Sequence, residues 1–216
     1  MIKGVIFDLD GTLLDTLPDL GAAMNRMLMQ LCYPVRSQEQ HQSAICYGAR
    51  EFARRSLPES KRDEKTVSCA LAAYRTYYTA ACTEGTRPYE GIAELLAKLC
   101  ARGIPVAVYS NKPMPQTRQV VAHYFGNIPF AAVIGHLEGT PTKPDPTVAL
   151  SIARQMGFSP SEIAFVGDSD VDMQTACRAG MLPVGVLWGY RDKDTLASGG
   201  ALAFAETAEK LFEILS

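Results

Sequence analysis

Five short stretches of the chain are hydrophobic at nearly every position, without the alternation of apolar and polar residues that marks a half-buried strand. Strands that are covered on both faces in a parallel sheet have this continuous pattern. The stretches predict five strands, at residues 2–7, 105–109, 130–134, 163–166 and 182–187.

Between the later strands, apolar residues recur three or four positions apart, which is the spacing of one helix face. This spacing predicts helices at 92–99, 148–156 and 171–179, each with a glycine shortly after it, as is common at helix ends. Residues 159–162 have the pattern of a capping box. Because strands that alternate with helices are typical of α/β domains, we predict an α/β fold. Its core is expected to be a doubly wound, Rossmann-like parallel sheet of about five strands.

The long segment after the first strand contains no convincing strand and is helical in character. One apolar stripe runs from Leu17 to Leu31, and residues 48–57 and 64–83 give two further predicted helices, the last with three tyrosines that we expect in a core. We predict that residues 16–85 form a small helical cap domain inserted into a core domain of residues 1–15 and 86–216. Its place directly after the first strand suits a lid over a site.

Charge and composition exclude several classes of function. The 216 residues carry a net charge of −2 and no basic stripe, so we expect no nucleic-acid partner. No apolar run reaches the ~20 residues that cross a bilayer, and the start of the chain does not resemble a signal peptide. The six cysteines are scattered without a C-x-x-C pair, which favours free thiols. We therefore expect a cytoplasmic protein without a membrane partner, as a monomer or weak homodimer.

Four polar clusters stand at the ends of predicted strands or in the loops that follow them. Each alone has an ordinary explanation as a turn, a helix cap or a first helical turn. Ligands of open α/β sheets, however, bind outside the carboxyl ends of the strands, so the four together indicate one site. They are Asp8 with Asp10, Ser110-Asn111-Lys112, Thr142-Lys143-Pro144-Asp145-Pro146, and Gly167-Asp168-Ser169-Asp170-Val171-Asp172.

The residue types in these clusters suit phosphoryl transfer. Several carboxylates without a nearby arginine in the sequence call for a cation, and oxygen ligands favour a hard ion such as Mg²⁺. A hydroxyl, an amide and a lysine are the groups that bind a phosphate. Positioning and charge neutralisation do most of the work in phosphoryl transfer.

The motifs resemble those of the haloacid dehalogenase superfamily of phosphohydrolases, in the branch similar to phosphoglycolate phosphatase. The resemblance covers essentially the whole chain. It is most specific in the opening Phe7-Asp8-Leu9-Asp10-Gly11-Thr12-Leu13-Leu14-Asp15-Thr16 and in Val166-Gly167-Asp168-Ser169 with Asp172.

The resemblance implies a mechanism. Asp8 would be the nucleophile that forms an aspartyl-phosphate, and Asp10 would be the general acid and then the general base. The metal would bind the Asp8 carboxylate, the Asp10 backbone carbonyl and Asp168, and Asp172 would act through a second-shell role or a bound water.

The same resemblance implies the substrate-binding groups. Ser110, the Asn111 amide and Lys143 would hold the phosphoryl oxygens, with Ser110 and Lys143 also counted as catalytic. Gly11 and Thr12, beside the nucleophile, belong to the same pocket. In the cap, Arg50 follows the position of a glycine-containing specificity loop and is expected to pair with a substrate carboxylate, with Arg54 and Arg55 as rivals.

Three differences between this sequence and other branches of the superfamily argue against particular activities. The presence of Asp10 argues against carbon–halogen cleavage. The segment from Leu17 to Leu31 contains no lysine, which argues against phosphonate chemistry through a Schiff base. Leu20 stands where the mutase relatives have a histidine, which argues against a mutase. The leading hypothesis is a Mg²⁺-dependent phosphatase of a small phosphorylated metabolite, with 2-phosphoglycolate as first guess. Alternatives are a pyrophosphatase, a nucleoside monophosphate or sugar-phosphate phosphatase, a mutase, or a non-catalytic binding protein.

Overall fold

A computed structural model describes all residues from Met1 to Ser216, and the chain divides into two compact units. Unit 1 comprises Met1–Asp15 and Pro88–Ser216. Unit 2 comprises Thr16–Arg87. The first unit contains the large sheet, and the second is helical.

Unit 1 is built on a six-stranded parallel sheet with the order β5-β4-β1-β6-β7-β8. Its strands are β1 (Gly4–Phe7), β4 (Val106–Pro113), β5 (Ala132–His136), β6 (Ile163–Gly167), β7 (Leu182–Val186) and β8 (Ala203–Ala205). The five predicted strands are all present. The sixth, β8, was missed because three residues, Ala-Phe-Ala, are too short to form a recognisable hydrophobic run.

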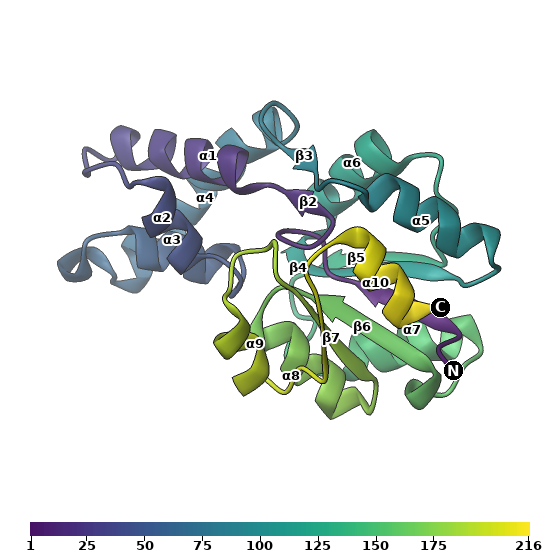
Figure 1. The fold of residues 1–216 in the computed structure, drawn as a ribbon. Coiled ribbons are helices and arrows are strands. Elements are labelled where there is room, and N and C mark those ends of the chain that lie inside the picture. Colours follow the sequence, from purple (N-terminus) through teal and green to yellow (C-terminus); the bar gives the residue numbers. More distant parts are fainter. The chain divides into compact units, whose positions relative to one another are not determined.

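Helices cover both faces of this sheet, so the prediction of a doubly wound α/β fold is confirmed. On one face lie α5 (Ile92–Ala101), α6 (Met114–Phe125) and α10 (Ala208–Leu215), and on the other α7 (Thr147–Met156) and α8 (Asp170–Ala179), as Figure 1 shows. Ile6 and Phe165 of the sheet pack with Ile152 of α7 and Ala176 of α8 in a buried core. The short α9 (Lys193–Ser198) precedes β8.

The predicted helix ends and capping box are also present. Gly157 and Gly180 follow α7 and α8 in the left-handed conformation, with φ of 79° and 69°. Before β6, the Ser159 N–H donates a 3.0 Å hydrogen bond to Glu162 at the start of the short 3-10 helix Pro160–Glu162. These local signals fix where the chain turns back into the sheet.

Unit 2 consists of α1 (Leu17–Gln30), α2 (Gln38–Ala44), α3 (Ala49–Ser56) and α4 (Glu64–Ala81), with a 3-10 turn at Glu59–Lys61. Met24, Met27 and Leu28 of α1 are fully buried. Of the three tyrosines expected in a core, Tyr74 and Tyr78 of α4 are buried, whereas Tyr77 is half-buried. No hydrophobic stripe marks α2, because its sequence is polar apart from one alanine. Its signal is a capping box, in which Ser37 and Gln40 bond each other's backbone N–H.

One aspartate joins the two ends of unit 2. The carboxylate of Asp19, in the first turn of α1, accepts hydrogen bonds from the Thr86 N–H at 2.8 Å and the Thr86 hydroxyl at 2.7 Å. It also accepts one from the Gly85 N–H at 2.6 Å. The segment that enters unit 2 is thereby bound to the segment that leaves it.

The chain leaves and re-enters unit 1 at neighbouring points. The short strands β2 (Leu14–Asp15) and β3 (Arg87–Pro88) pair, and the Tyr89 N–H donates to the Leu13 carbonyl at 3.2 Å. No disulfide joins any of the six cysteines. No helix combines the length and hydrophobicity that a membrane crossing requires.

Candidate active site

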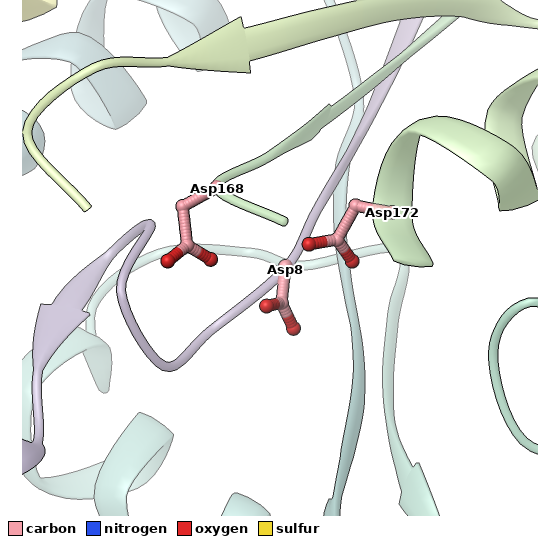
Figure 2. Close-up of side chains that lie close together, drawn as sticks. All are labelled: Asp8, Asp168 and Asp172. Carbon is pink, nitrogen blue, oxygen red and sulfur yellow. The ribbon is translucent and has the colours of Figure 1, made fainter. Parts of the chain in front are cut away.

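Three carboxylates from different parts of the sequence meet at the carboxyl edge of the sheet. Asp8 directly follows β1, Asp168 directly follows β6, and Asp172 lies in the first turn of α8. Because β1 and β6 are paired with Phe7 opposite Val166, their ends place Asp8 and Asp168 side by side. Figure 2 shows the three side chains close together, and one oxygen from each lies within 4.8 Å of the others.

Asp168 is enclosed by two loops whose glycines leave no room for a side chain. Its carboxylate accepts hydrogen bonds from the Tyr190 N–H at 2.8 Å and the Thr12 hydroxyl at 3.4 Å. A Cβ on Gly11 would lie 2.2 Å from Asp168 Oδ2, and a Cβ on Gly189 would lie 2.2 Å from Asp168 Cβ. Gly11 and Thr12, predicted to bind substrate, therefore have a packing role around Asp168 in this structure.

Lys143 is the cation within the acidic cluster. Its Nζ lies 2.7 Å from Asp8 Oδ1 and 2.5 Å from Asp172 Oδ1, and its side chain is 3% exposed. The other oxygen of Asp172 accepts hydrogen bonds from the Ser169 hydroxyl at 2.5 Å and the Ser169 N–H at 3.1 Å. Both oxygens of Asp172 thus have donors within the protein.

Burial and mutual repulsion make this cluster electrostatically unusual. Burial, together with the charge of Asp172, raises the pKa of Asp8 to about 7 against the opposing effect of Lys143. Burial and the neighbouring Asp172 and Asp8 also raise the pKa of Asp168 well above its ordinary value. Burial alone would lower the pKa of Lys143, but Asp172 and Asp8 outweigh it and raise that pKa.

The donor set fits a hard divalent cation. Three buried carboxylates converge, and the single ammonium of Lys143 cannot balance them. Carboxylate oxygens at this spacing are the ligands that Mg²⁺ and related ions take. The buried acidic cluster predicted from the sequence is therefore present and suited to a metal.

The Ser-Asn motif lies on β4, next to β1. Ser110 is 3% exposed, and its Oγ accepts from the Lys112 N–H at 3.3 Å. The Asn111 side chain binds the backbone of Lys143, accepting from its N–H at 2.9 Å and donating to its carbonyl at 3.2 Å. The Asn111 side chain therefore positions the loop that contains Lys143.

Asp10, two residues beyond Asp8, has a lysine partner that sequence reasoning left without a role. The Nζ of Lys112 lies 2.7 Å from Asp10 Oδ1, and the side chains are 2% and 17% exposed respectively. The only signal in the sequence was the position of Lys112 directly after Ser110-Asn111. Nothing in the sequence indicated that its partner would be Asp10, because the two lie 102 positions apart.

The predicted arginine candidates belong to unit 2. Arg50, in the first turn of α3, forms an exposed ion pair with Glu64. Arg54 and Arg55 both bind Glu51 on the same helix, at 2.7 Å each. Each of the three arginines thus has a carboxylate partner within its own unit.

Known proteins are similar to this chain in sequence. Residues 2–180 match the model of the haloacid dehalogenase-like hydrolases. Phosphoglycolate phosphatase of Escherichia coli (strain K12) is 33% identical over 213 residues, covering 88% of this chain and 82% of that protein. Phosphoglycolate phosphatase of Pseudomonas putida is 36% identical over 191 residues, covering 86% and 70%.

A solved crystal structure is similar to this chain in fold. The crystal structure of a provisionally named phosphoglycolate phosphatase from Lactobacillus delbrueckii subsp. bulgaricus superimposes with a TM-score of 0.92 at 29% identity. It covers 99% of this chain and 98% of that one. The chain therefore belongs to the haloacid dehalogenase-like hydrolases and is a phosphoric monoester hydrolase of that family.

Proposed function

We propose that this protein is a Mg²⁺-dependent phosphatase of a small phosphomonoester, with 2-phosphoglycolate as the first candidate. The observation that carries the proposal is the buried cluster of Asp8, Asp168, Asp172 and Lys143, with Asp10 beside it. The substrate is suggested by the names of the relatives, which are phosphoglycolate phosphatases.

The first step transfers the phosphoryl group to the protein. An oxygen of Asp8 forms a bond to phosphorus, the bond from phosphorus to the leaving oxygen breaks, and Asp10 gives that oxygen a proton. In the second step a water oxygen bonds to phosphorus while Asp10 accepts its proton. The bond between phosphorus and Asp8 then breaks, which frees phosphate and restores both aspartates.

Charge in this site is shared between a metal and a lysine. Mg²⁺, held by the carboxylates of Asp8 and Asp168 and the backbone carbonyl of Asp10, would neutralise the phosphoryl oxygens. Lys143 balances the charge of Asp8, and the buried Asp172 holds Lys143 in place. Because one Asp172 oxygen meets the Lys143 ammonium and the other accepts two hydrogen bonds from Ser169, we assign Asp172 an indirect role toward the metal.

The phosphoryl group is proposed to bind to residues of unit 1. Ser110 and the Asn111 backbone are proposed to bind the phosphoryl oxygens, with Gly11 and Thr12 shaping the wall beside Asp168. Unit 2 is proposed as the lid that excludes water. Within it, Arg50 remains the candidate for a substrate carboxylate, which would have to compete with Glu64 for the guanidinium.

The test is phosphate release from a panel of phosphomonoesters and pyrophosphate, with Mg²⁺ and with chelator. Asp8→Asn, nearly isosteric, should abolish turnover, and Asp194→Asn, at an exposed position, should not. A non-catalytic binding protein would release no phosphate from any compound, and full activity of Asp8→Asn would exclude the covalent mechanism. A mutase would return an isomerised sugar phosphate, which product analysis detects.

A further inference from the structure

The ion pair between Lys112 and Asp10 is too enclosed to be a surface pairing. The Nζ to Oδ1 distance is 2.7 Å, and the lysine side chain is 2% exposed. Lysine is almost never fully buried unless it is paired, because its charge loses hydration. The position of Lys112 therefore calls for an explanation in terms of the carboxylate that it meets.

We propose that Lys112 is a positioning residue, whose ammonium holds the Asp10 carboxylate in the orientation from which Asp10 exchanges protons with the leaving oxygen and with water. The inference rests on the proposed function of this site. It assigns the two lysines to different carboxylates, since Lys143 meets Asp8 and Asp172 while Lys112 meets Asp10.

The backbone of Lys112 is anchored, so its ammonium extends from a fixed point. Its N–H donates to Ser110 Oγ at 3.3 Å, and its carbonyl accepts from the buried Thr117 hydroxyl at 3.1 Å. Gly135 packs so closely that a Cβ there would lie 2.7 Å from the same carbonyl. A cation held in this way restrains whatever carboxylate it binds.

Such restraint matters because a general acid works only within hydrogen-bond reach of the atom that it protonates. Asp10 is partly exposed, at 17% of its side chain, and would otherwise be able to rotate toward solvent. The ion pair engages Oδ1, and the second carboxylate oxygen is then presented for proton transfer.

The first test compares two leaving groups in Lys112→Met. An alkyl phosphomonoester such as 2-phosphoglycolate needs a proton on its leaving oxygen, whereas p-nitrophenyl phosphate leaves as a stable phenolate. We compare kcat/KM, which reports the transfer to Asp8 and not the later hydrolysis. We expect about a tenfold or larger fall for the alkyl ester, within reach of acid–base effects, and a much smaller one for the aryl ester. Equal falls for both esters would overturn the inference.

The second test is a double-mutant cycle with Asp10→Asn, measured on the alkyl ester. If Lys112 acts through Asp10, adding Lys112→Met to Asp10→Asn should cost no more than about a further twofold, whereas independent effects would multiply. Multiplying losses would therefore contradict the assignment.

Controls separate a failure to fold from a loss of positioning. Lys210→Met removes an exposed lysine that also pairs with a carboxylate, Glu213 at 2.9 Å, and should leave both esters unaffected. If Lys112→Met does not fold, Lys112→Gln provides the same comparison, and Lys112→Arg should restore part of the activity on the alkyl ester.

A wild-type chain that releases phosphate from neither ester would overturn the proposed function and this inference together. Normal wild-type activity with an unaffected Lys112→Met would overturn the inference only.

Discussion

Lys143 and Asp172 form a fully enclosed ion pair, with Nζ 2.5 Å from Oδ1 and side chains that are 3% and 0% exposed. Since Lys143 also lies 2.7 Å from Asp8, one ammonium serves two buried carboxylates. Its removal would leave both without a protein cation.

Lys143→Met should therefore both destabilise the metal-free protein and reduce catalysis. Breaking a buried pair from one side typically costs about 3–5 kcal/mol, because a charge remains buried without its partner. Urea unfolding without metal measures this loss, and phosphate release with Mg²⁺ should fall at least about a hundredfold, the scale of losing one electrostatic contact in a transition state. Lys210→Met is the matched control, and equal effects of the two variants would refute the role of Lys143.

Asp168→Asn should separate metal binding from stability. In the wild type, Mg²⁺ at a hundred times its Kd should add about 2.7 kcal/mol to the free energy of unfolding. The variant should lose most of this gain. Without metal it should be at least as stable as the wild type, because burial and repulsion by Asp172 and Asp8 disfavour the charged form of Asp168. Thermal unfolding with and without Mg²⁺ tests both points, and an undiminished Mg²⁺ shift would remove Asp168 from the metal site.

Gly11→Ala and Gly139→Ala form a matched pair. Both glycines have positive φ, 88° and 80°, so both substitutions incur backbone strain of about 1–2 kcal/mol. At Gly139 nothing lies within 4 Å of the added Cβ, whereas at Gly11 it would meet Asp168 Oδ2 at 2.2 Å. We expect Gly11→Ala to lose a further 1–3 kcal/mol or so from overpacking and most of its activity. Similar stability and activity in the two variants would show that the loop yields easily.

His41 predicts an acid-sensitive stability. Its ring is buried in unit 2, with Nε2 3.1 Å from Asn25 Oδ1, and burial together with the charge of Arg36 lowers its pKa to about 4. The unfolded chain, with an ordinary histidine pKa of about 6.5, binds the proton first on acidification. The contribution of His41 is thus complete above pH 6.5 and is lost as the pH falls toward 4, by about 3 kcal/mol.

Urea unfolding from pH 7 to pH 4 measures this slope. His41→Gln should flatten the profile, whereas His123→Gln, at an exposed histidine, should not change it. An unaltered slope in His41→Gln would assign the acid sensitivity to other groups.

The sheet and the acidic cluster were predictable from the sequence for a common reason. Strands buried on both faces must be apolar throughout, and parallel strands bring their carboxyl ends to one edge. Asp8 and Asp168 were therefore identifiable as neighbours although 160 positions separate them in the sequence.

The features that could not be predicted are mostly contacts between residues far apart in the sequence, because such contacts leave no local pattern. The pairing of Lys112 with Asp10 needs the register between β1 and β4, in which Phe7 lies opposite Val108. Likewise, nothing in the sequence indicated that the Asn111 side chain would bind the backbone of Lys143, because the two residues lie 32 positions apart. Strand β8 was missed because it has only three residues, which pair with β7 at the sheet edge.

The hydrogen bond from the Tyr89 N–H to the Leu13 carbonyl bears on how the length of unit 2 can change in evolution. Unit 2 is one long insertion into the unit that contains the six-stranded sheet, and it lies in the sequence between Leu13 and Tyr89, whose backbones are hydrogen-bonded. Closing a loop of such length costs little more than closing a shorter one, since loop entropy grows only logarithmically. We therefore expect insertions or deletions in unit 2, or its replacement, to leave the strand order and the aspartate cluster intact. Unit 2 and the aspartate cluster are thus encoded in separate stretches of the gene, which are free to diversify at different rates.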